Sequence, residues 1–294
     1  MELCRGNQVD VYLQGQIWES HAGTECEGMD SIVELEHVHV ARGNNVVLHD
    51  LSLRIDRGEH LAILGPNGCG KSTLLKTITC ELYPVVRPET RVRIMGRERW
   101  DLTELKRRMG VVAAELPGRQ TLSITGLDAV LTGFFSSSTL WPNLAVTDRM
   151  RERAEDILIQ INAESLRGTP VGEMSAGQQR RIMIGRAMAG TSSNDLDGSV
   201  QMLLLDEPSN ALDLTAQQDL REMLRTLAQR GTAILLITHH IADILPEIGR
   251  IVMMNAGHIV ADGSKEDLLT AQHLGTLFGR EIALTERDGY WNAW

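Results

Sequence analysis

One stretch, residues 59–79, constrains the fold more than any other part of this chain. It opens with the apolar run Leu61–Leu64, which predicts a short buried strand, continues as a glycine-rich turn and ends in a segment of helix-forming Leu and Lys. The turn matches the pattern G-x-x-x-x-G-K-[ST], whose four defining positions are held in register by Gly65, Gly70, Lys71 and Ser72. A strand, this turn and a helix, in that order, predict a loop that binds phosphate groups.

The residue types of this loop suit contact with phosphate. Glycines let the backbone curl so that successive N–H groups point inward at phosphate oxygens, and the start of the helix adds its positive dipole end. Lys71 can reach the β- and γ-phosphates of a nucleotide, and the Ser72 hydroxyl can bind Mg²⁺. The predicted contact residues are Gly65, Pro66, Asn67, Gly68, Cys69, Gly70, Lys71, Ser72 and Thr73.

The rest of the chain alternates strand and helix signals around this loop. Residues 1–30 have no clear period, which predicts a poorly ordered extension, and two alternating segments, 33–40 and 46–55, predict an antiparallel β start. Residues from about 117 to 190 lack strand signals and predict a mostly helical insert. Buried strands that alternate with helices elsewhere predict an α/β fold, in which a mainly parallel sheet carries helices on both faces. We therefore expect one domain over residues 31–294.

Composition excludes several classes of protein. The net charge of −10 argues against a general nucleic-acid surface, so no nucleic-acid partner is expected. The longest apolar runs fall far short of the roughly 18 residues that predict a membrane span, and no basic-then-apolar leader is visible at the N-terminus. Four cysteines, without metal-ligand spacing or a disulfide framework, favour a reducing cytosol.

A pair of acidic residues follows a second buried strand. Val200–Leu205 is apolar and leads directly into Asp206 and Glu207, which places both carboxylates at the carboxyl end of the sheet, where open α/β sheets bind ligands. Asp206 is predicted to hold Mg²⁺ through water, and Glu207 to polarise the attacking water as a general base. A strand followed by Asp-Glu is common, so this pair becomes specific only together with the phosphate loop.

The segment from Ser175 to Gln178 predicts the start of a second anion-binding helix. Ser175 is a good N-cap, and the small residues Ala176 and Gly177 expose backbone N–H groups. Because the phosphate loop already holds the γ-phosphate on its own side, the economical arrangement is a head-to-tail pair of chains. In that pair the Ser175 end of each chain covers the nucleotide bound by Lys71 of the other.

Together these motifs resemble those of the ATP-binding cassette (ABC) ATPases, over about residues 31–270. All five family motifs occur in the family's order: Gly65–Thr73 is similar to the Walker A loop, Met174–Gln178 to the LSGGQ signature, Met202–Glu207 to Walker B, Ser209–Asp213 to the D-loop, and His239 to the switch histidine. The resemblance implies binding and hydrolysis of ATP with Mg²⁺ in a sandwich dimer, formed with a second copy or a homologous ATPase. It also implies that His239 contacts the γ-phosphate and that Asp213 couples the two sites.

Two positions depart from the family pattern. Arg42 stands where an aromatic residue usually stacks on adenine, and it is either a base-stacking guanidinium or a solvated turn residue. The family also has a glutamine after the strand at 110–114, which touches Mg²⁺ and senses the transmembrane partner. Here Ala114 or Glu115 occupies that position, depending on a one-residue choice of register. Glu115 could bind Mg²⁺ and Ala114 could not, so the resemblance supports ATP binding more firmly than turnover or coupling to a partner.

The resemblance also implies partners. Since no membrane span is visible, transport would require separate transmembrane permease subunits, as is typical of bacterial importers, and would place this chain in the cytoplasm on the inner face of the membrane. The tail from Leu268 to Leu284 looks like that of iron-chelate and cobalamin importer ATPases, whereas Val130–Phe135 looks like the molybdate-type branch. We expect import of a metal chelate or an oxyanion. The alternatives are a soluble ABC ATPase that acts as a regulator or scaffold, and a nucleotide-binding subunit with weak hydrolysis.

Overall fold

The computed structural model describes residues 31–115, 117–190 and 202–294; the extension predicted at residues 1–30 lies outside the described residues. The strands are β1 (Ser31–Arg42), β2 (Asn45–Asp56), β3 (Leu61–Leu64), β4 (Arg91–Ile94), β5 (Met109–Val112), β6 (Met202–Asp206), β7 (Ala233–Thr238), β8 (Arg250–Asn255), β9 (His258–Ser264), β10 (Leu284–Arg287) and β11 (Tyr290–Ala293). The α-helices are α1 (Lys71–Ile78), α2 (Leu102–Arg108), α3 (Arg119–Leu122), α4 (Gly126–Thr132), α5 (Asp148–Gln160), α6 (Ala176–Met188), α7 (Leu214–Gln229), α8 (Lys265–Leu268) and α9 (Ala271–Phe278). Short 3₁₀ turns join them at η1 (Gly133–Phe135), η2 (Glu164–Leu166), η3 (Val171–Glu173) and η4 (Ile241–Asp243).

The central sheet has the strand order β5-β6-β7-β3-β8-β9. Its first five strands run parallel, and β9 returns antiparallel to β8. Every residue of β3, β6 and β7 is buried, which explains why these strands appear in the sequence as continuous apolar runs. The predicted α/β fold with a mainly parallel sheet is therefore confirmed. The strand that leads into the phosphate loop, β3, lies inside this sheet, between β7 and β8.

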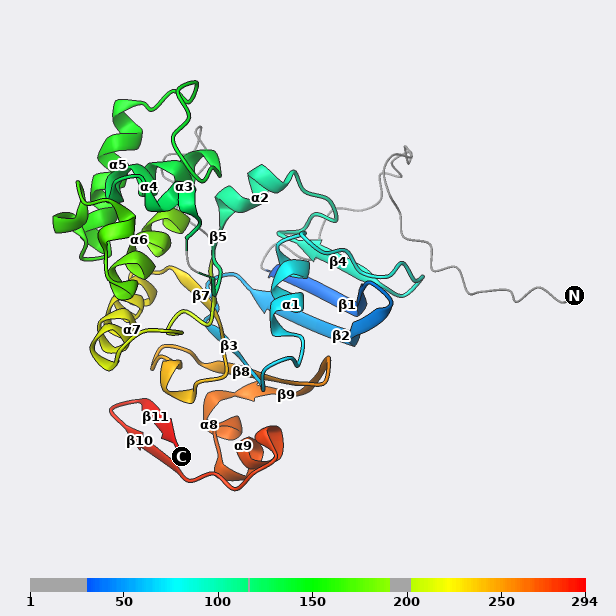
Figure 1. Cartoon of the computed structure of the whole chain (residues 1–294). Coiled ribbons are helices and arrows are strands. Elements are labelled where there is room, and N and C mark those ends of the chain that lie inside the picture. Colours follow the sequence, from blue (N-terminus) through cyan, green and yellow to red (C-terminus); the bar gives the residue numbers. More distant parts are fainter. Residues whose placement is uncertain (1–30, 116, 191–201) are drawn as a thin grey trace, which may run out of the picture.

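A three-stranded antiparallel sheet, ordered β2-β1-β4, packs with α1 against one side of the central sheet. The two alternating segments predicted at 33–40 and 46–55 form β1 and β2, which pair antiparallel with several register shifts. Figure 1 shows this sheet and α1 at one end of the molecule and the helices α3 to α6 at the other. The core between the two sheets includes Val38, Leu53, Ile63, Leu74, Ile78, Leu235 and Ile237.

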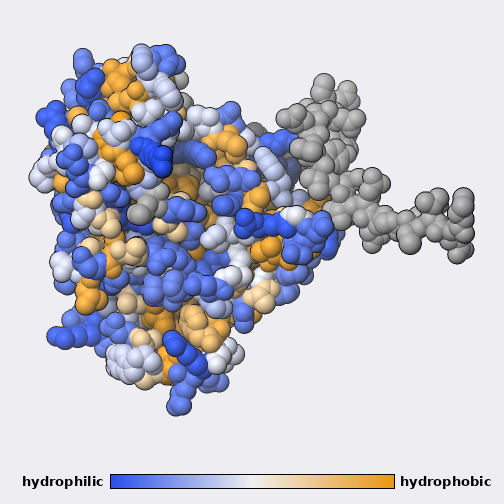
Figure 2. All heavy atoms as spheres, viewed as in Figure 1, coloured by the Kyte–Doolittle hydropathy of each residue, from blue (hydrophilic) through white to orange (hydrophobic). Residues whose placement is uncertain are grey.

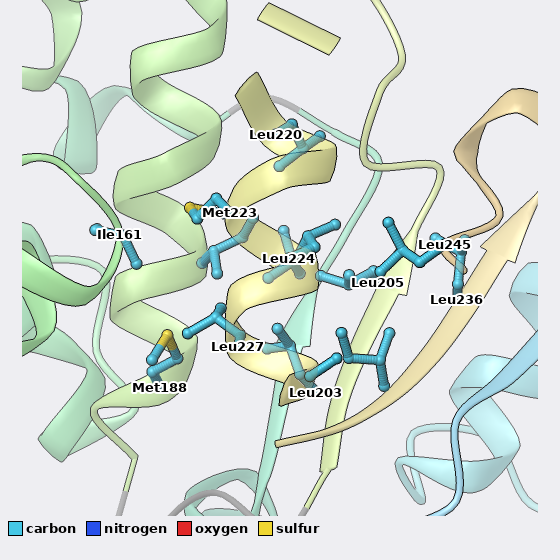
Figure 3. Close-up of a cluster of buried hydrophobic side chains, with 14 of the residues drawn as sticks. Ile161, Met188, Leu203, Leu205, Leu220, Met223, Leu224, Leu227, Leu236 and Leu245 are labelled. Atoms are coloured by element: carbon cyan, nitrogen blue, oxygen red, sulfur yellow. The ribbon is translucent and has the colours of Figure 1, made fainter. Parts of the chain in front are cut away.

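Helices α3 to α6 fill the sequence between β5 and β6, where strand signals are absent. Ala154, Ile157 and Leu158 have the spacing of one face of an amphipathic helix, and all three are buried on α5. Helix α7 lies on the same side of the sheet as the helical part, and it presents Leu220, Met223, Leu224 and Leu227 to their shared core. Figure 3 shows these side chains between Met188 of α6 and the strand residues Leu203, Leu205 and Leu236. The helical part and the central sheet thus share one apolar core.

In the C-terminal part, the sequence predicts one helix from Lys265 to about Phe278 and a strand-like segment at residues 281–285, and the structure differs from both predictions. The helix expected from Lys265 to Phe278 is two helices, because Thr270 caps α9 by accepting a hydrogen bond from the N–H of His273 at 3.2 Å. The strand expected at residues 281–285 begins at Leu284 and forms a hairpin with β11. The turn of that hairpin is Asp288-Gly289, and both residues have positive φ. Asp-Gly is itself a strong hairpin signal in the sequence.

The surface of the molecule is polar and mixed. Figure 2 shows the apolar side chains of one face as small patches separated by hydrophilic groups. No helix within residues 31–115, 117–190 and 202–294 combines the length and apolar character needed to cross a membrane.

Candidate nucleotide site

The phosphate loop joins β3 to α1, and glycine is favoured in it by close packing at Gly65 and by backbone conformation at Gly68 and Gly70. A Cβ on Gly65 would lie 2.3 Å from the carbonyl oxygen of Met254, in the turn between β8 and β9. The N–H of Gly257 in the same turn donates a 2.9 Å hydrogen bond to the carbonyl of Cys69. Gly68 and Gly70 have φ of 80° and 109°, a conformation that costs a residue with a Cβ about 1–2 kcal/mol. The loop is therefore held from behind by the β8–β9 turn.

Lys71, the first residue of α1, contacts the beginning of this loop through its side chain. Its Nζ donates hydrogen bonds to the carbonyl of Gly65 at 2.8 Å and to that of Pro66 at 3.1 Å. The same Nζ lies 3.9 Å from Oε1 of Glu207, and the lysine side chain is only 4% exposed. A buried ammonium is thus fixed over the loop, where it favours an anion.

Ser72 and Asp206 meet beside Lys71, from two elements far apart in the sequence. The Ser72 hydroxyl donates a 3.1 Å hydrogen bond to Oδ2 of Asp206. Asp206 is buried, and this burial raises the pKa of its carboxyl, with smaller upward contributions from the charges of Glu207 and Glu115. A hydroxyl and a carboxylate are hard oxygen ligands, so these two residues fit Mg²⁺. No group of three or more His, Cys, Asp or Glu in the part of the chain that the structure describes is arranged to hold a metal. An ion there would take its other ligands from phosphate and water.

Glu207 is the residue on which the site converges. It has a φ of 45° and its N–H donates to the carbonyl of Ile237 at 2.8 Å, which anchors the turn after β6 to β7. Its Oε1 lies 2.9 Å from Nδ1 of His239, which follows β7. Its Oε2 accepts a 2.9 Å hydrogen bond from Nδ2 of Asn210. The carboxylate is therefore gripped at both oxygens, beside Lys71.

The signature segment lies on the helical part, away from these groups. Ser175 and Gln178 form a capping box: the Ser175 hydroxyl accepts from the Gln178 backbone N–H at 3.3 Å, and the side-chain Oε1 of Gln178 accepts from the Ser175 N–H at 2.9 Å. A Cβ on Gly177 would lie 2.8 Å from Cβ of Ala216, so glycine allows α6 to approach α7. Ala176 completes this helix start. Within the described ranges, the side-chain hydrogen bonds of Ser175 and Gln178 stay inside the capping box, and none joins these two side chains to the phosphate loop.

Asp213 and Arg42 have different environments. Asp213 is the N-cap of α7, where its Oδ1 accepts from the Ala216 N–H at 2.8 Å, and it is exposed. Arg42 is exposed at the end of β1, and in the described part of the chain its side chain makes no hydrogen bond or ion pair. The role of Arg42 toward a nucleotide base therefore stays a prediction.

The two candidates for the altered glutamine position, Ala114 and Glu115, have different environments in the loop after β5. Ala114 contributes its carbonyl, which accepts a hydrogen bond from Arg180 of α6 at 3.0 Å. Glu115 is exposed, and its charge acts on Asp206. A cavity of about 470 Å³ lies next to this loop, lined by residues of β5 and of the helical part that include Ala113, Glu115, Pro117, Gln120, Met183 and Arg186.

Three residues of this site were missed by reasoning from sequence. Asn210 lies inside the D-loop motif and Arg180 follows the signature by two residues, but neither carried a predicted role. Asp243, in η4, follows the switch histidine and has no periodic signal that would mark it. Only the spatial arrangement identifies these three residues.

The comparisons with known proteins agree with this geometry. A family model described as ABC transporter matches residues 48–210. The hemin import ATP-binding protein HmuV of Burkholderia ambifaria is 33% identical over 263 residues, which cover 85% of this chain and 94% of the relative. The phosphonates import ATP-binding protein PhnC 2 of Nostoc sp. is 31% identical over 244 residues, covering 81% of this chain and 96% of the relative. A solved structure, the ADP conformation of MJ1267, an ATP-binding cassette of an ABC transporter, superimposes with a TM-score of 0.72 at 25% identity, covering 85% of this chain and 99% of that one.

Proposed function

Because this chain belongs to the ABC transporter family, we propose that it is the ATP-hydrolysing subunit of an importer and works as a head-to-tail dimer. The chain is an ATPase of that family. The observation that carries the proposal is the convergence of Lys71, Ser72, Asp206, Glu207 and His239 at the carboxyl end of the parallel sheet. Residues 31–294 would form one ATPase domain, with residues from about 117 to 190 as its helical insert.

In this proposal each group of the site has one task. The phosphate loop, Gly65–Thr73, holds the β- and γ-phosphates through its backbone N–H groups, and Lys71 places its charge beside them. Ser72 and Asp206 hold Mg²⁺, with Glu115 near enough to add a charge. A bound Mg²⁺ neutralises the charge on the phosphate oxygens. Glu207 accepts a proton from the water that attacks the γ-phosphorus, and ADP leaves with the electrons of the broken P–O bond.

The exposed Ser175 at the start of α6 supports the dimer. The N-terminus of the helix that it caps can bind an anion, and in the dimer that anion would be the nucleotide held by the other subunit. In a head-to-tail pair, Ser175, Ala176, Gly177 and Gln178 cover the γ-phosphate bound by the partner subunit, and the exposed Asp213 faces the junction between the two sites. Adenine would lie near Arg42, whose free guanidinium can stack on a base.

The transport role rests on the relatives and on the cavity beside β5. HmuV and PhnC 2 are named for the import of hemin, a metal chelate, and of phosphonates, which are oxygen-rich anions. We extend import of one of these cargo classes to this chain. A permease segment bound in the cavity lined by Glu115 and the helical part would contact the loop after β5. That assembly would place the chain on the cytoplasmic face of the membrane.

The test is steady-state ATP hydrolysis against protein concentration, with Glu207→Gln compared with Glu222→Gln, an exposed glutamate on α7. Activity should rise faster than linearly with concentration in the unmodified chain and in the Glu222 variant. The Glu207 variant should bind ATP but turn over about 10³-fold more slowly, the usual range for loss of a general base, and should accumulate as an ATP-bound dimer in light scattering. A Glu207→Gln variant that hydrolyses normally, or remains a monomer at saturating ATP, would refute the proposal.

A further inference from the structure

The two groups that hold the Glu207 carboxylate come from two separate segments. Asn210, in the segment after β6, donates to Oε2 at 2.9 Å. His239, after β7, has its Nδ1 2.9 Å from Oε1. A carboxylate gripped at both oxygens keeps one orientation only if the two segments keep a fixed spacing.

One buried side chain sets that spacing. The hydroxyl of Ser209, the residue before Asn210, donates to Oδ2 of Asp243. The hydroxyl of Thr238, the residue before His239, donates to the same Oδ2 at 3.0 Å. Asp243 is only 5% exposed, so both bonds form away from water. A single carboxylate oxygen therefore joins the residues that immediately precede the two groups holding Glu207.

The bridge continues into the backbone beyond the switch histidine. The N–H of His240 donates to the Thr238 hydroxyl at 2.9 Å, and the Asp243 N–H donates to the His240 carbonyl at 3.2 Å. His239 therefore lies inside a closed loop of hydrogen bonds that runs from Thr238 to Asp243. On its outer side η4, which carries Asp243, packs against β11 of the C-terminal hairpin.

We propose that Asp243 is a positioning residue for ATP hydrolysis: its carboxylate ties Ser209 to Thr238 and so fixes Asn210 and His239 on the two oxygens of Glu207. Asp243 touches neither substrate nor Glu207, and it acts only through these two segments. The inference rests on the proposed function, because it assigns a consequence to the orientation of Glu207.

The test cuts each end of the bridge without removing the buried carboxylate. The variants are Ser209→Ala, Thr238→Val and the double variant, with Thr238→Ser as the conservative replacement that keeps the hydroxyl. Ser31→Ala is the matched control, since Ser31 is also buried and donates a 2.6 Å hydrogen bond to a carboxylate, that of Glu34, far from the site. The readouts are kcat, the half-saturating ATP concentration and Tm.

Each single variant should lower kcat by about tenfold, the loss expected when a hydrogen bond to a charged group no longer positions a reacting residue, while the half-saturating ATP concentration changes by less than about twofold. The double variant should lose no more than about twofold beyond the weaker single variant, because one cut already breaks the bridge. Thr238→Ser should retain the kcat of the unmodified chain within about threefold, since it keeps the donor.

Three results would overturn the inference. Single variants that hydrolyse ATP at the rate of Ser31→Ala would show that the bridge does not matter. A double variant whose loss equals the product of the two single losses would show that the residues act independently. Absence of any ATPase activity that depends on Glu207 would overturn both this inference and the proposed function, and the Glu207→Gln comparison identifies that case.

Discussion

The guanidinium of Arg180 donates a 2.6 Å hydrogen bond to the carbonyl oxygen of Ala113, and a second bond of 3.0 Å to the carbonyl of Ala114. Arg180 is 5% exposed, and burial lowers the pKa of its guanidinium. The first helix turns after the signature segment are thereby tied to the loop after β5, which carries Glu115. This arginine links the helical part to the edge of the nucleotide site.

Arg180→Gln should destabilise the protein, because a glutamine is too short to reach both carbonyls. Hydrogen bonds from a charged donor contribute about 1.5–3 kcal/mol each, and the partly exposed loop recovers some of that from water, so we expect a loss of about 2 kcal/mol. Urea denaturation measures it. Arg181→Gln, on the same helix, removes a more exposed ion pair with Asp219 and should cost less than about 1 kcal/mol. If both variants lose the same free energy of unfolding, the bonds from Arg180 to the two carbonyls contribute no more to stability than an exposed ion pair.

Lys71→Ala should abolish measurable ATP binding. The variant removes the only ammonium that bonds to the loop carbonyls among the described residues, and with it the charge that faces the phosphates. We expect the Kd for a fluorescent ATP analogue to rise by at least about 100-fold, since hydrogen bonds to charged groups contribute about 1.5–3 kcal/mol each. Lys76→Ala, in the last turn of the same helix, should leave Kd unchanged. Unchanged affinity in the Lys71 variant would remove the phosphate loop from the proposal.

Ser175→Arg should separate binding from turnover. The long side chain would block the exposed end of α6 where the partner subunit's nucleotide is expected, while the phosphate loop of the same chain stays intact. ATP affinity of the monomer, measured by fluorescence, should remain, and concentration-dependent hydrolysis should be lost. Thr147→Arg places the same side chain on an exposed N-cap, that of α5, and should hydrolyse ATP normally. Normal hydrolysis by Ser175→Arg would refute the role of the signature segment.

Asp206→Asn should raise Tm in the absence of Mg²⁺ and nucleotide. Burial raises the pKa of Asp206 in the folded chain above its unfolded value. The folded state therefore binds the proton more tightly, and the ionised carboxylate lowers the free energy of unfolding at higher pH. The gain from Asn should therefore be complete above the folded pKa, shrink as the pH falls through it, and vanish below the unfolded pKa. Thermal melts across that range, with the exposed Asp219→Asn as control, check the sign. A variant that is less stable at neutral pH would contradict it.

Much of the fold could be predicted because its strands obey simple periods. The runs that became β3, β6 and β7 are apolar up to their last residues, as strands buried on both faces must be, with Asp206 ending β6 and Thr238 ending β7. The C-terminal part was harder to predict. Leu269 interrupts a helical period that looks continuous from Lys265 to Phe278, and only the cap at Thr270 reveals the break. The cap at Thr270 therefore divides into two helices a segment that the hydrophobic pattern alone predicts as one.

The sequence predicted the site residues that lie in short local motifs. It did not predict the residues whose role depends on contacts between segments far apart in the sequence. Lys71 and Ser72 are adjacent in the sequence, and the family pattern points to Glu207. Asp243 is different, because its partners Ser209 and Thr238 lie on the segments after β6 and β7, and nothing in the local sequence says that these segments share one oxygen. The roles of all these residues stay predictions until the variants above are made.

The strand that carries the phosphate loop, β3, is translated early, yet its neighbours in the sheet are β7 and β8, and the loop closes against the turn from Met254 to Gly257. On the ribosome, a growing chain therefore holds the complete Gly65–Ser72 sequence long before it holds the surface that shapes it. Full nucleotide affinity should appear only after the turn from Met254 to Gly257 has been synthesised. A fragment that ends before Gly257 should therefore bind ATP more weakly than the chain that includes this turn.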